Sequence, residues 1–256
     1  MKTVLTIAGS DTCAGAGIQQ DLKTVTSLGH YAVTVITALT AQNTVGVQGV
    51  MTVPADMLQA QLDSVLSDVE VAAVKIGMIP DAQSAHVIIE TLSHLSVPIV
   101  CDPVMLSTSG TQLMSDECID AIKRGLFPLC TLVTPNIPES ERLAGVTMAD
   151  AGNVGRMLVE RYGTSFLIKG GHAMGEMMTD HLYCVDGSVC EYISPRIATT
   201  NLHGTGCTLS SAVAALLAEG KNLQDAACGA KELIDKGIKQ GRLLSIGKGN
   251  GPLWLF

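Results

Sequence analysis

Short apolar runs and amphipathic segments alternate along the 256 residues of the chain. We predict strands for the short β-rich runs, which are Lys2–Ala8, Tyr31–Thr37, Val71–Ile76, Val97–Cys101, Thr131–Thr134 and Ser165–Lys169. Between them, apolar residues recur at three- and four-residue intervals and predict helices, as with Ile18, Leu22 and Val25. We expect helices from about Gly15, from Pro54, over residues 81–95 and 115–126, around Val154 to Leu158, and over Gly206–Gly220 and Asn222–Gly241.

This alternation is typical of an α/β protein with a mostly parallel central sheet, because parallel strands buried on both faces read as short continuous apolar runs. One passage breaks the alternation: His181–Val185 and Val189–Ile193 flank Asp186-Gly187-Ser188 and predict a small antiparallel hairpin at a sheet edge. The sequence shows no linker or repeat, so we expect a single domain over residues 1–256. Open sheets of this kind bind ligands beyond the carboxyl ends of their strands.

Composition raises the question of a membrane, since 47% of the residues are hydrophobic and the mean hydropathy is +0.35. Polar residues nevertheless interrupt every apolar run well before the roughly 18 residues that a spanning helix needs. The stretch after Lys2 breaks at Gly9-Ser10-Asp11, unlike a signal peptide. We therefore expect a cytoplasmic protein without a membrane partner.

Charge and cysteine usage point to a small-molecule ligand. The net charge is −8, only 3% of the residues are aromatic, and no basic run is present, which argues against nucleic-acid binding. The eight cysteines form no CxxC pair or cluster at metal-ligand spacing, so neither a zinc site nor a disulfide framework is indicated.

The most informative loop is Gly204-Thr205-Gly206, which stands at the start of an apolar helix. Its three consecutive N–H groups, with the helix dipole behind them, are suited to the charge on a transferring phosphoryl group, although an ordinary helix N-cap explains the local sequence equally well. In this positive environment we expect the pKa of the Cys207 thiol to fall, so that Cys207 can accept a proton from an attacking hydroxyl group. The alternative for Cys207 is a packed thiol.

Oxygen-bearing and basic side chains follow three of the predicted strands. Asp102 ends one strand, and Asn136 and Glu139 lie where the next helix begins, so they are candidate ligands of Mg²⁺, which needs only one or two carboxylates when phosphates complete its shell. Helix capping explains Asn136 and Glu139 equally well. Lys169 ends a strand beside Gly170 and suits a phosphate, while a surface lysine is the alternative.

Taken together, the loops resemble the hydroxymethylpyrimidine/phosphomethylpyrimidine kinases of thiamine biosynthesis, which belong to the ribokinase-like superfamily. The matching motifs span nearly the whole chain and are Thr6–Asp11, Gly15–Gln19, Asp21–Thr24, Thr40–Thr44, Lys75–Met78, Asp102–Met105, Asn136 with Glu139, Lys169–His172, His203–Thr208 and Gly247–Gly249. The resemblance implies a three-layer α/β/α fold. It also implies that ATP with Mg²⁺ phosphorylates 4-amino-5-hydroxymethyl-2-methylpyrimidine to its monophosphate and then to its diphosphate.

The resemblance assigns roles to individual residues. Gln42 resembles the glutamine that reads the polar edge of the pyrimidine, and the substrate is expected among Gly9, Ala16, Asp21, Met78 and Val104. An exposed position on a helix is the alternative for Asp21, and core packing is the alternative for Met78. Gly204, Thr205 and Gly206 correspond to the anion hole, and Cys207 stands where sugar kinases of the superfamily use aspartate. Asn136, Glu139 and Asp102 correspond to the residues that organise Mg²⁺, while Lys169, Gly170, Gly247, Lys248 and Gly249 are expected along the nucleotide.

Three other functions stay open at this point. Pyridoxal kinases share the His203–Cys207 motif, so this motif does not decide the substrate; Thr40–Thr44, Lys75–Met78 and Lys169–His172 favour the pyrimidine kinases. The first loop also departs from the family pattern at Thr12, Cys13 and Ala14. A sugar or nucleoside kinase is disfavoured by Cys207, and a non-catalytic pyrimidine-binding protein is disfavoured by the presence of the phosphate and metal groups. The few charges and the edge hairpin leave room for a homodimer.

Overall fold

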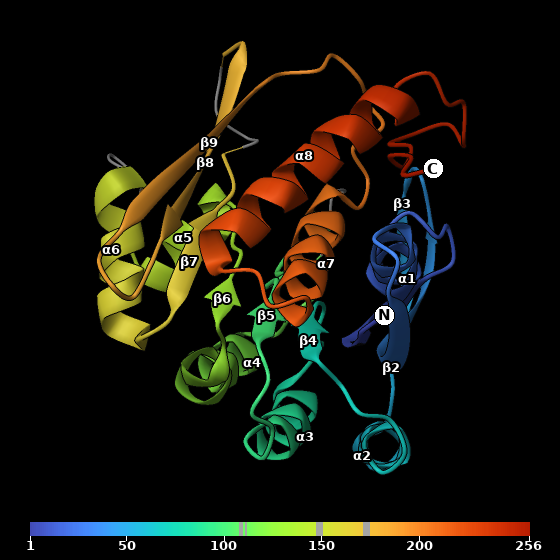
Figure 1. The fold of residues 1–256 in the computed structure, drawn as a ribbon. Coiled ribbons are helices and arrows are strands. Elements are labelled where there is room, and N and C mark those ends of the chain that lie inside the picture. Colours follow the sequence, from blue (N-terminus) through green and yellow to red (C-terminus); the bar gives the residue numbers. More distant parts are fainter. Residues whose placement is uncertain (108–109, 111, 147–150, 171–174) are drawn as a thin grey trace.

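A nine-stranded sheet runs through the middle of the molecule, in the order β3-β2-β1-β4-β5-β6-β7-β8-β9 (Figure 1). The computed structural model describes residues 1–107, 110, 112–146, 151–170 and 175–256. The strands are β1 (Thr3–Asp11), β2 (Tyr31–Asn43), β3 (Gly46–Thr52), β4 (Ala73–Ile76), β5 (Ile99–Cys101), β6 (Leu132–Val133), β7 (Ser165–Ile168), β8 (Met177–Tyr183) and β9 (Val189–Pro195). The pairs from β2 to β7 are parallel, and β3, β8 and β9 are antiparallel to their neighbours.

Helices cover both faces of the sheet. One face carries α1 (Gly17–Ser27), α7 (Thr205–Ala218) and α8 (Leu223–Gly241). The other carries α2 (Ala55–Leu66), α3 (Ala82–Leu92), α4 (Asp116–Ala121), α5 (Ile137–Ala144) and α6 (Ala151–Tyr162), and α4 continues through a π-helical turn, η1 (Ile122–Leu126), into a 3-10 turn, η2 (Phe127–Leu129). The predicted three-layer α/β/α architecture is confirmed. Among the described residues, no helix is long and apolar enough to cross a membrane.

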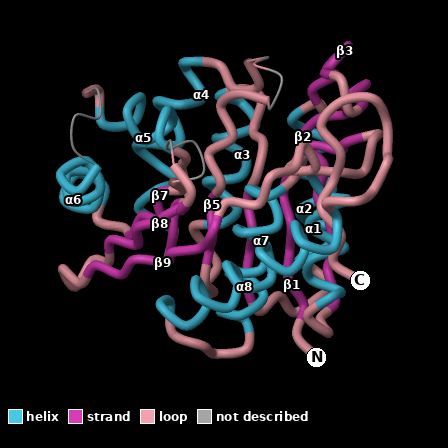
Figure 2. Tube along the Cα trace, turned by 90° about the horizontal axis from the view of Figure 1, so that it is seen from above, coloured by secondary structure: helices cyan, strands magenta, loops and turns pink. Residues whose placement is uncertain are grey.

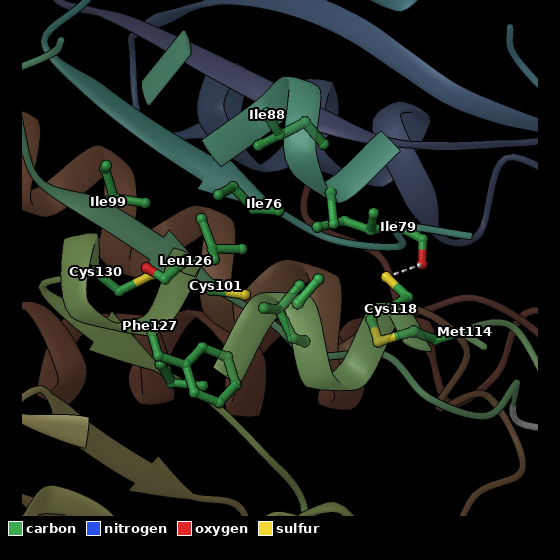
Figure 3. Close-up of a cluster of buried hydrophobic side chains, with 14 of the residues drawn as sticks. Ile76, Ile79, Ile88, Ile99, Cys101, Met114, Cys118, Leu126, Phe127 and Cys130 are labelled. Carbon is green, nitrogen blue, oxygen red and sulfur yellow. Dashed lines mark hydrogen bonds between the residues drawn. The ribbon is translucent and has the colours of Figure 1, made fainter. Parts of the chain in front are cut away.

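Strand side chains alternate between the two layers of helices, as the pleat of a sheet requires. In β1, Leu5 and Ile7 pack with α2 and α3, while Val4 packs with α7 and α8. Figure 3 shows part of the core between the sheet and the layer of helices α2 to α6, where the Cys118 thiol donates to the carbonyl oxygen of Ile79 at 3.5 Å. Burial on both faces explains why the strands read as continuous apolar runs in the sequence.

The two edges of the sheet were predicted with unequal success. The hairpin of β8 and β9 is confirmed at one edge, although β8 begins at Met177, before the predicted His181. At the opposite edge (Figure 2), β2 runs to Asn43 instead of ending at Thr37, and it pairs with β3, which was not predicted. The residues of β3 are at most half-buried and include Gly46 and Gly49, so no buried alternation marks this strand in the sequence.

A fully buried ion pair joins the sheet to one helical layer. Lys75 of β4 donates to both carboxylate oxygens of Asp21 of α1 at 2.8 Å, and neither side chain has any exposed surface. Asp21 also accepts hydrogen bonds from the hydroxyl groups of Thr6 and Ser211. Although burial alone would lower the pKa of Lys75, the charge of Asp21 raises it well above its usual value. Asp21 is therefore a core residue. Its position contradicts both the predicted substrate contact and the alternative of an exposed position on a helix.

Replacing Lys75 alone tests this ion pair. We expect Lys75→Met to lower the free energy of unfolding by about 3–5 kcal/mol in urea denaturation, because it leaves the Asp21 carboxylate buried without a compensating charge. The double variant Asp21→Asn with Lys75→Met should recover part of the loss, since a neutral amide removes the unpaired charge and its one oxygen still accepts from one of the two hydroxyl groups, Thr6 or Ser211. Equal stability of Lys75→Met and the unsubstituted protein would show that the pair contributes nothing.

Candidate active site

Two adjacent cavities open at the carboxyl ends of the parallel strands. The first has a volume of about 260 Å³ and lies among the loops after β1, β4 and β5, the end of β2, and the start of α7. The second has a volume of about 460 Å³ and extends toward α8 and β8. They share a wall formed by Leu106, Ser107, Asn136, Glu139, Lys169, Leu202, Thr205 and Gly206. A molecule bound in one cavity therefore meets a molecule bound in the other at these residues.

The first cavity contains five of the six residues predicted to surround a substrate, namely Gly9, Ala16, Gln42, Met78 and Val104. Asp21 does not line it, whereas Lys75, its partner in the buried ion pair, does. The cavity is largely apolar along Met78 and Val104 and polar at Gln42. This combination suits a small, flat ring with one polar edge.

The glycine turn that begins α7 is fitted closely against its surroundings. Gly204 is the N-cap of α7 with φ +84°, and a Cβ atom there would lie 1.8 Å from the carbonyl oxygen of Gly15. The N–H of Thr205 donates to the carbonyl of Leu202 at 3.3 Å, whereas those of Gly206 and Cys207 lie in the first helical turn, which has no internal acceptors. Gly206 and Cys207 are thus the strongest donors of the predicted anion hole, and both residues line the first cavity.

An ion pair stands beside this turn, with its lysine on the shared wall and its aspartate in the first cavity. Lys169, which follows β7, donates to Asp102 Oδ1 at 2.7 Å, and Asp102, which follows β5, is buried. A Cβ atom on Gly206 would lie 3.0 Å from Asp102 Oδ2 and 3.3 Å from Lys169 Nζ, so only glycine allows the helix to begin so close to the pair. Burial alone would lower the pKa of Lys169, but Asp102 and Glu139 raise it above its usual value. Lys169 therefore carries a permanent positive charge between the two cavities.

Asn136 and Glu139 form a capping box at the start of α5. Asn136 Oδ1 accepts from the N–H of Glu139 at 2.9 Å, and Glu139 Oε2 accepts from the N–H of Asn136 at 2.8 Å. Glu139 Oε1 lies 3.3 Å from the N–H of Met105. Burial raises the pKa of Glu139, against the opposing effect of Lys169. The capping alternative is thus present in the structure, and both residues also line both cavities.

The oxygen atoms on this wall fit a magnesium ion that is bound mainly through phosphate and water. Asp102, in the loop after β5, lines the first cavity, and Glu139, in the first turn of α5 after the adjacent strand β6, lines both; each supplies hard carboxylate oxygens. In the described part of the chain, no group of three or more His, Cys, Asp or Glu is arranged to hold a metal by itself. Mg²⁺ commonly takes one or two carboxylates and completes its shell with waters and substrate phosphates.

The expectation for the Cys207 thiol is wrong in its direction. Burial raises the pKa of Cys207 to about 11, and Asp21 and Asp102 act in the same direction, whereas the charge of Lys75 and a hydrogen bond from the N–H of Gly17 lower it. The sequence showed the helix N-terminus but not the two buried carboxylates nearby. Cys207 is therefore a protonated thiol at neutral pH.

Four of the residues predicted along the nucleotide do not line either cavity. The N–H groups of Lys248 and Gly249 donate to Thr44 Oγ1 at 3.1 Å, and Gly247 also packs against Thr44, so this loop covers the β2–β3 turn. The N–H of Gly170 donates to Asp180 Oδ1 at 2.7 Å, and a Cβ atom on Gly170 would overlap the backbone of Thr179. Gly171 and His172, which end the predicted Lys169–His172 motif, lie outside the described residues.

Sequence reasoning assigned no role to several side chains that line the cavities. Asp11 and His203 lie 2.9 Å apart on the wall of the first cavity, and Lys75 also lines it. Lys75 could have been recognised from the sequence, because it stands within the apolar run Val74–Ile76 and a buried charge needs a partner. The second cavity is lined by Arg142, Asp180, Arg196 and Lys231, which come from three distant elements and one loop and share no motif.

Comparison with known proteins gives a consistent assignment. The family model described as phosphomethylpyrimidine kinase matches residues 11–254. The chain is 43% identical to a hydroxymethylpyrimidine/phosphomethylpyrimidine kinase of Rhizobium meliloti, covering 98% of this chain and 96% of the relative. It is 44% identical to a thiamine biosynthesis bifunctional protein of Geobacter sulfurreducens, of which it spans only 51%.

The fold is also similar to that of a solved ADP complex of Bacillus subtilis pyridoxal kinase. The TM-score is 0.90 at 32% identity, and the match covers 100% of this chain and 97% of that structure. This likeness confirms the predicted ribokinase-like fold, since the order of the sheet and the flanking helices superimpose over the whole chain. With a family model that matches all but the ends of the sequence, the chain belongs to the phosphomethylpyrimidine kinase family.

Proposed function

We propose that this chain uses ATP and Mg²⁺ to phosphorylate 4-amino-5-hydroxymethyl-2-methylpyrimidine to its monophosphate and then to its diphosphate, as a step of thiamine biosynthesis. The observation that carries the proposal is the wall shared by the two cavities, where Lys169, Glu139 and the first turn of α7 come together, with Asp102 beside them in the first cavity. The name of the Rhizobium meliloti relative, which covers the full chain, supports the same substrate. The continuous nine-stranded sheet supports treating residues 1–256 as one catalytic domain.

The acceptor occupies the first cavity in this proposal. Gln42 offers both a donor and an acceptor, which is what the amino group and adjacent ring nitrogen of an aminopyrimidine need. Met78 and Val104 line the same cavity and contact the ring. The hydroxymethyl group then points toward Cys207 and the N-terminus of α7. Gln42 therefore favours an aminopyrimidine over pyridoxal, the substrate of the structurally similar Bacillus subtilis enzyme.

ATP occupies the second cavity, with its terminal phosphate at the shared wall. Lys169 meets this phosphate, and the N–H groups of Gly206 and Cys207 stabilise the charge that spreads over its oxygens during transfer. Arg142, Arg196 and Lys231 line the remainder of the cavity and offset the net charge of −8 locally. Asp102 and Glu139 would hold Mg²⁺, which neutralises phosphate charge when bound.

The two phosphorylations make different demands on Cys207. The first acceptor is a neutral hydroxyl group that must lose a proton, whereas the second is a phosphate monoester that is largely ionised at neutral pH because its second pKa is ~6. A thiol with a pKa of about 11 is mostly protonated, so the small thiolate fraction limits the first step. The charge of Lys75, which favours the thiolate, makes this base usable.

We further propose that the enzyme is a homodimer of the cytoplasm. All eight cysteines are free, including buried Cys101, Cys118, Cys130 and Cys184, as is usual in a reducing compartment. Apolar side chains are exposed on β2, β3 and α2: Leu39 and Met51 lie opposite each other in the strand pair, and Val50 on β3 and Met57 on α2 lie nearby in the chain. An edge strand with exposed apolar side chains is suited to cover by a second copy.

Turnover assays test the proposed substrate. We expect ADP release with Mg-ATP and the hydroxymethylpyrimidine, and again with its monophosphate, with kcat/KM for the pyrimidine at least about tenfold above that for pyridoxal. A preference for pyridoxal would overturn the substrate assignment. Pyrimidine binding in calorimetry without ADP release would instead identify a non-catalytic binding protein.

Substitution of Cys207 tests its role as base. We expect Cys207→Ala to reduce the single-turnover rate of the first phosphorylation by about 10²-fold or more, within the usual contribution of a general base, and to change the second by less than about tenfold. Because the base must be deprotonated, the first-step rate of the unsubstituted enzyme should rise with pH toward about 11, and this rise should be absent from Cys207→Ala. Equal losses in both steps would leave Cys207 as part of the anion hole.

Charge insertion tests the dimer. We expect Met51→Lys, on β3, to convert the dimer into a monomer in light-scattering measurements, because a lysine would have to be buried without a partner. Met177→Lys is the matched control, since Met177 is similarly exposed on β8 near the opposite edge of the sheet. Dissociation by Met177→Lys alone would place the interface at that edge.

A further inference from the structure

Three side chains from distant parts of the chain meet on the wall of the first cavity. His203 Nε2, in the loop before α7, lies 2.9 Å from Asp11 Oδ2 at the end of β1 and 3.2 Å from the carboxamide of Gln42 near the end of β2. Asp11 and His203 are buried, with 3% and 6% of their surfaces exposed. All three residues line the cavity. Neither Asp11 nor His203 has a role in the transfer chemistry described above.

The Asp11 carboxylate determines where the proton of His203 lies. Its oxygens accept from the backbone N–H groups of Cys13, Gly15 and Ala16 at 2.8–3.0 Å. Burial alone would raise the pKa of Asp11, but the hydrogen bonds from His203 and from these N–H groups lower it below its usual value. An ionised carboxylate only accepts hydrogen bonds. His203 must therefore carry a hydrogen on Nε2 and donate it.

This proton in turn determines which end of the Gln42 carboxamide faces His203. A protonated Nε2 has no lone pair, so it cannot accept from the Gln42 amide nitrogen, which lies 3.2 Å away. Rotating the carboxamide by 180° places the carbonyl oxygen there, where it shares the single Nε2 hydrogen with Asp11 in a three-centre hydrogen bond. The other end of the carboxamide lies 3.3 Å from Thr40 Oγ1, whose single hydroxyl hydrogen is donated to the carbonyl of Ser10 at 3.0 Å. Thr40 therefore accepts, and it pairs with the Gln42 amide nitrogen. Both neighbours select the same orientation of the amide.

A fixed amide presents a fixed pattern to the cavity. A carboxamide has two N–H donors and two acceptor positions, and His203 and Thr40 use one of each. One donor and one acceptor remain, in an order that His203 sets. A 4-aminopyrimidine pairs a donating amino group with an accepting ring nitrogen, whereas its 4-oxo counterpart pairs an accepting oxygen with a donating ring N–H. An amide that is free to rotate by 180° can match either ring.

We propose that His203, held by Asp11, is a positioning residue that fixes the Gln42 carboxamide and so makes the enzyme select a 4-aminopyrimidine over the corresponding 4-oxopyrimidine. This inference rests on the proposed function for the identity of the acceptor. It goes beyond that function because it locates the selectivity in a histidine–carboxylate pair instead of in Gln42 alone.

The test measures kcat/KM and calorimetric Kd for 4-amino- and 4-oxo-5-hydroxymethyl-2-methylpyrimidine. We expect the unsubstituted enzyme to prefer the amino compound by at least about tenfold, the effect of one mispaired buried hydrogen bond. In His203→Leu this ratio should fall by about tenfold through a rise in KM for the amino compound and a fall in KM for the oxo compound. His203→Gln should retain the preference, because its NH₂ group donates to both Asp11 and Gln42.

Two further variants separate positioning from general damage to the loop. Thr208→Val removes the hydroxyl group that accepts from Gln20 and donates to the carbonyl of Gly204, so it loosens the same turn without contacting Gln42. It should leave the amino-to-oxo ratio unchanged. Thr40→Val removes the second anchor of the amide and should lower the ratio even if His203→Leu does not fold.

Each outcome has a distinct meaning. An unsubstituted enzyme that treats both rings alike, or a ratio that stays the same in both His203→Leu and Thr40→Val, overturns the inference. A ratio that falls equally in Thr208→Val also overturns it, because the effect would then belong to the loop. Absence of turnover and binding with either pyrimidine would contradict the proposed function itself, which is a different result from a selectivity that is independent of His203.

Discussion

Every charge in the centre of this molecule has to be neutralised by a partner, because helices cover both faces of the sheet and exclude water from its middle. Four pairs meet this requirement: Asp21 with Lys75, Asp102 with Lys169, Asp11 with His203, and Asp180 with Lys231. Each pair has at least one member that lines one of the two cavities at the carboxyl ends of the strands, and in the first pair this member is Lys75. The pairing of buried charges thus positions the groups that face the ligands.

The same requirement makes the thiol of Cys207 a weak acid. The N-terminus of a helix and a lysine favour a thiolate, but burial and two buried carboxylates oppose it more strongly. Without phosphates, the positive charge of Lys169 is offset by the negative charge of Asp102. In the proposed function, each phosphate brought to the shared wall would meet Lys169, which Asp102 holds in place, and the first turn of α7. Such preorganisation means that little rearrangement is needed as charge develops on the transferring group.

The scaffold is shared with a pyridoxal kinase over its whole length, so the order of the sheet carries no information about the acceptor. The choice of acceptor depends on a few side chains whose hydrogens point in defined directions. The Gln42 carboxamide has one orientation because His203 can only donate to it and Thr40 can only accept from it. Asp11 keeps the hydrogen of His203 on Nε2, and it also accepts hydrogen bonds from the backbone of the loop that precedes α1.

The sequence by itself determined the α/β class with a mostly parallel sheet and the hairpin of β8 and β9, and its resemblance to a known family indicated the three-layer arrangement and the loops that surround the two cavities. It could do so because burial on both faces leaves short apolar runs, and because the glycine turn of Gly204 and Gly206 is a local requirement. It did not reveal β3, whose half-exposed residues have no buried alternation, nor the packing of Gly247–Gly249 on Thr44. Only the tertiary structure decided that Asp21 is a core residue, that the pKa of Cys207 rises, and that His203 meets Gln42. Each depends on charges and hydrogen bonds between side chains far apart in the sequence, such as Asp21 and Lys75, which are 54 positions apart, and no local pattern encodes such a contact.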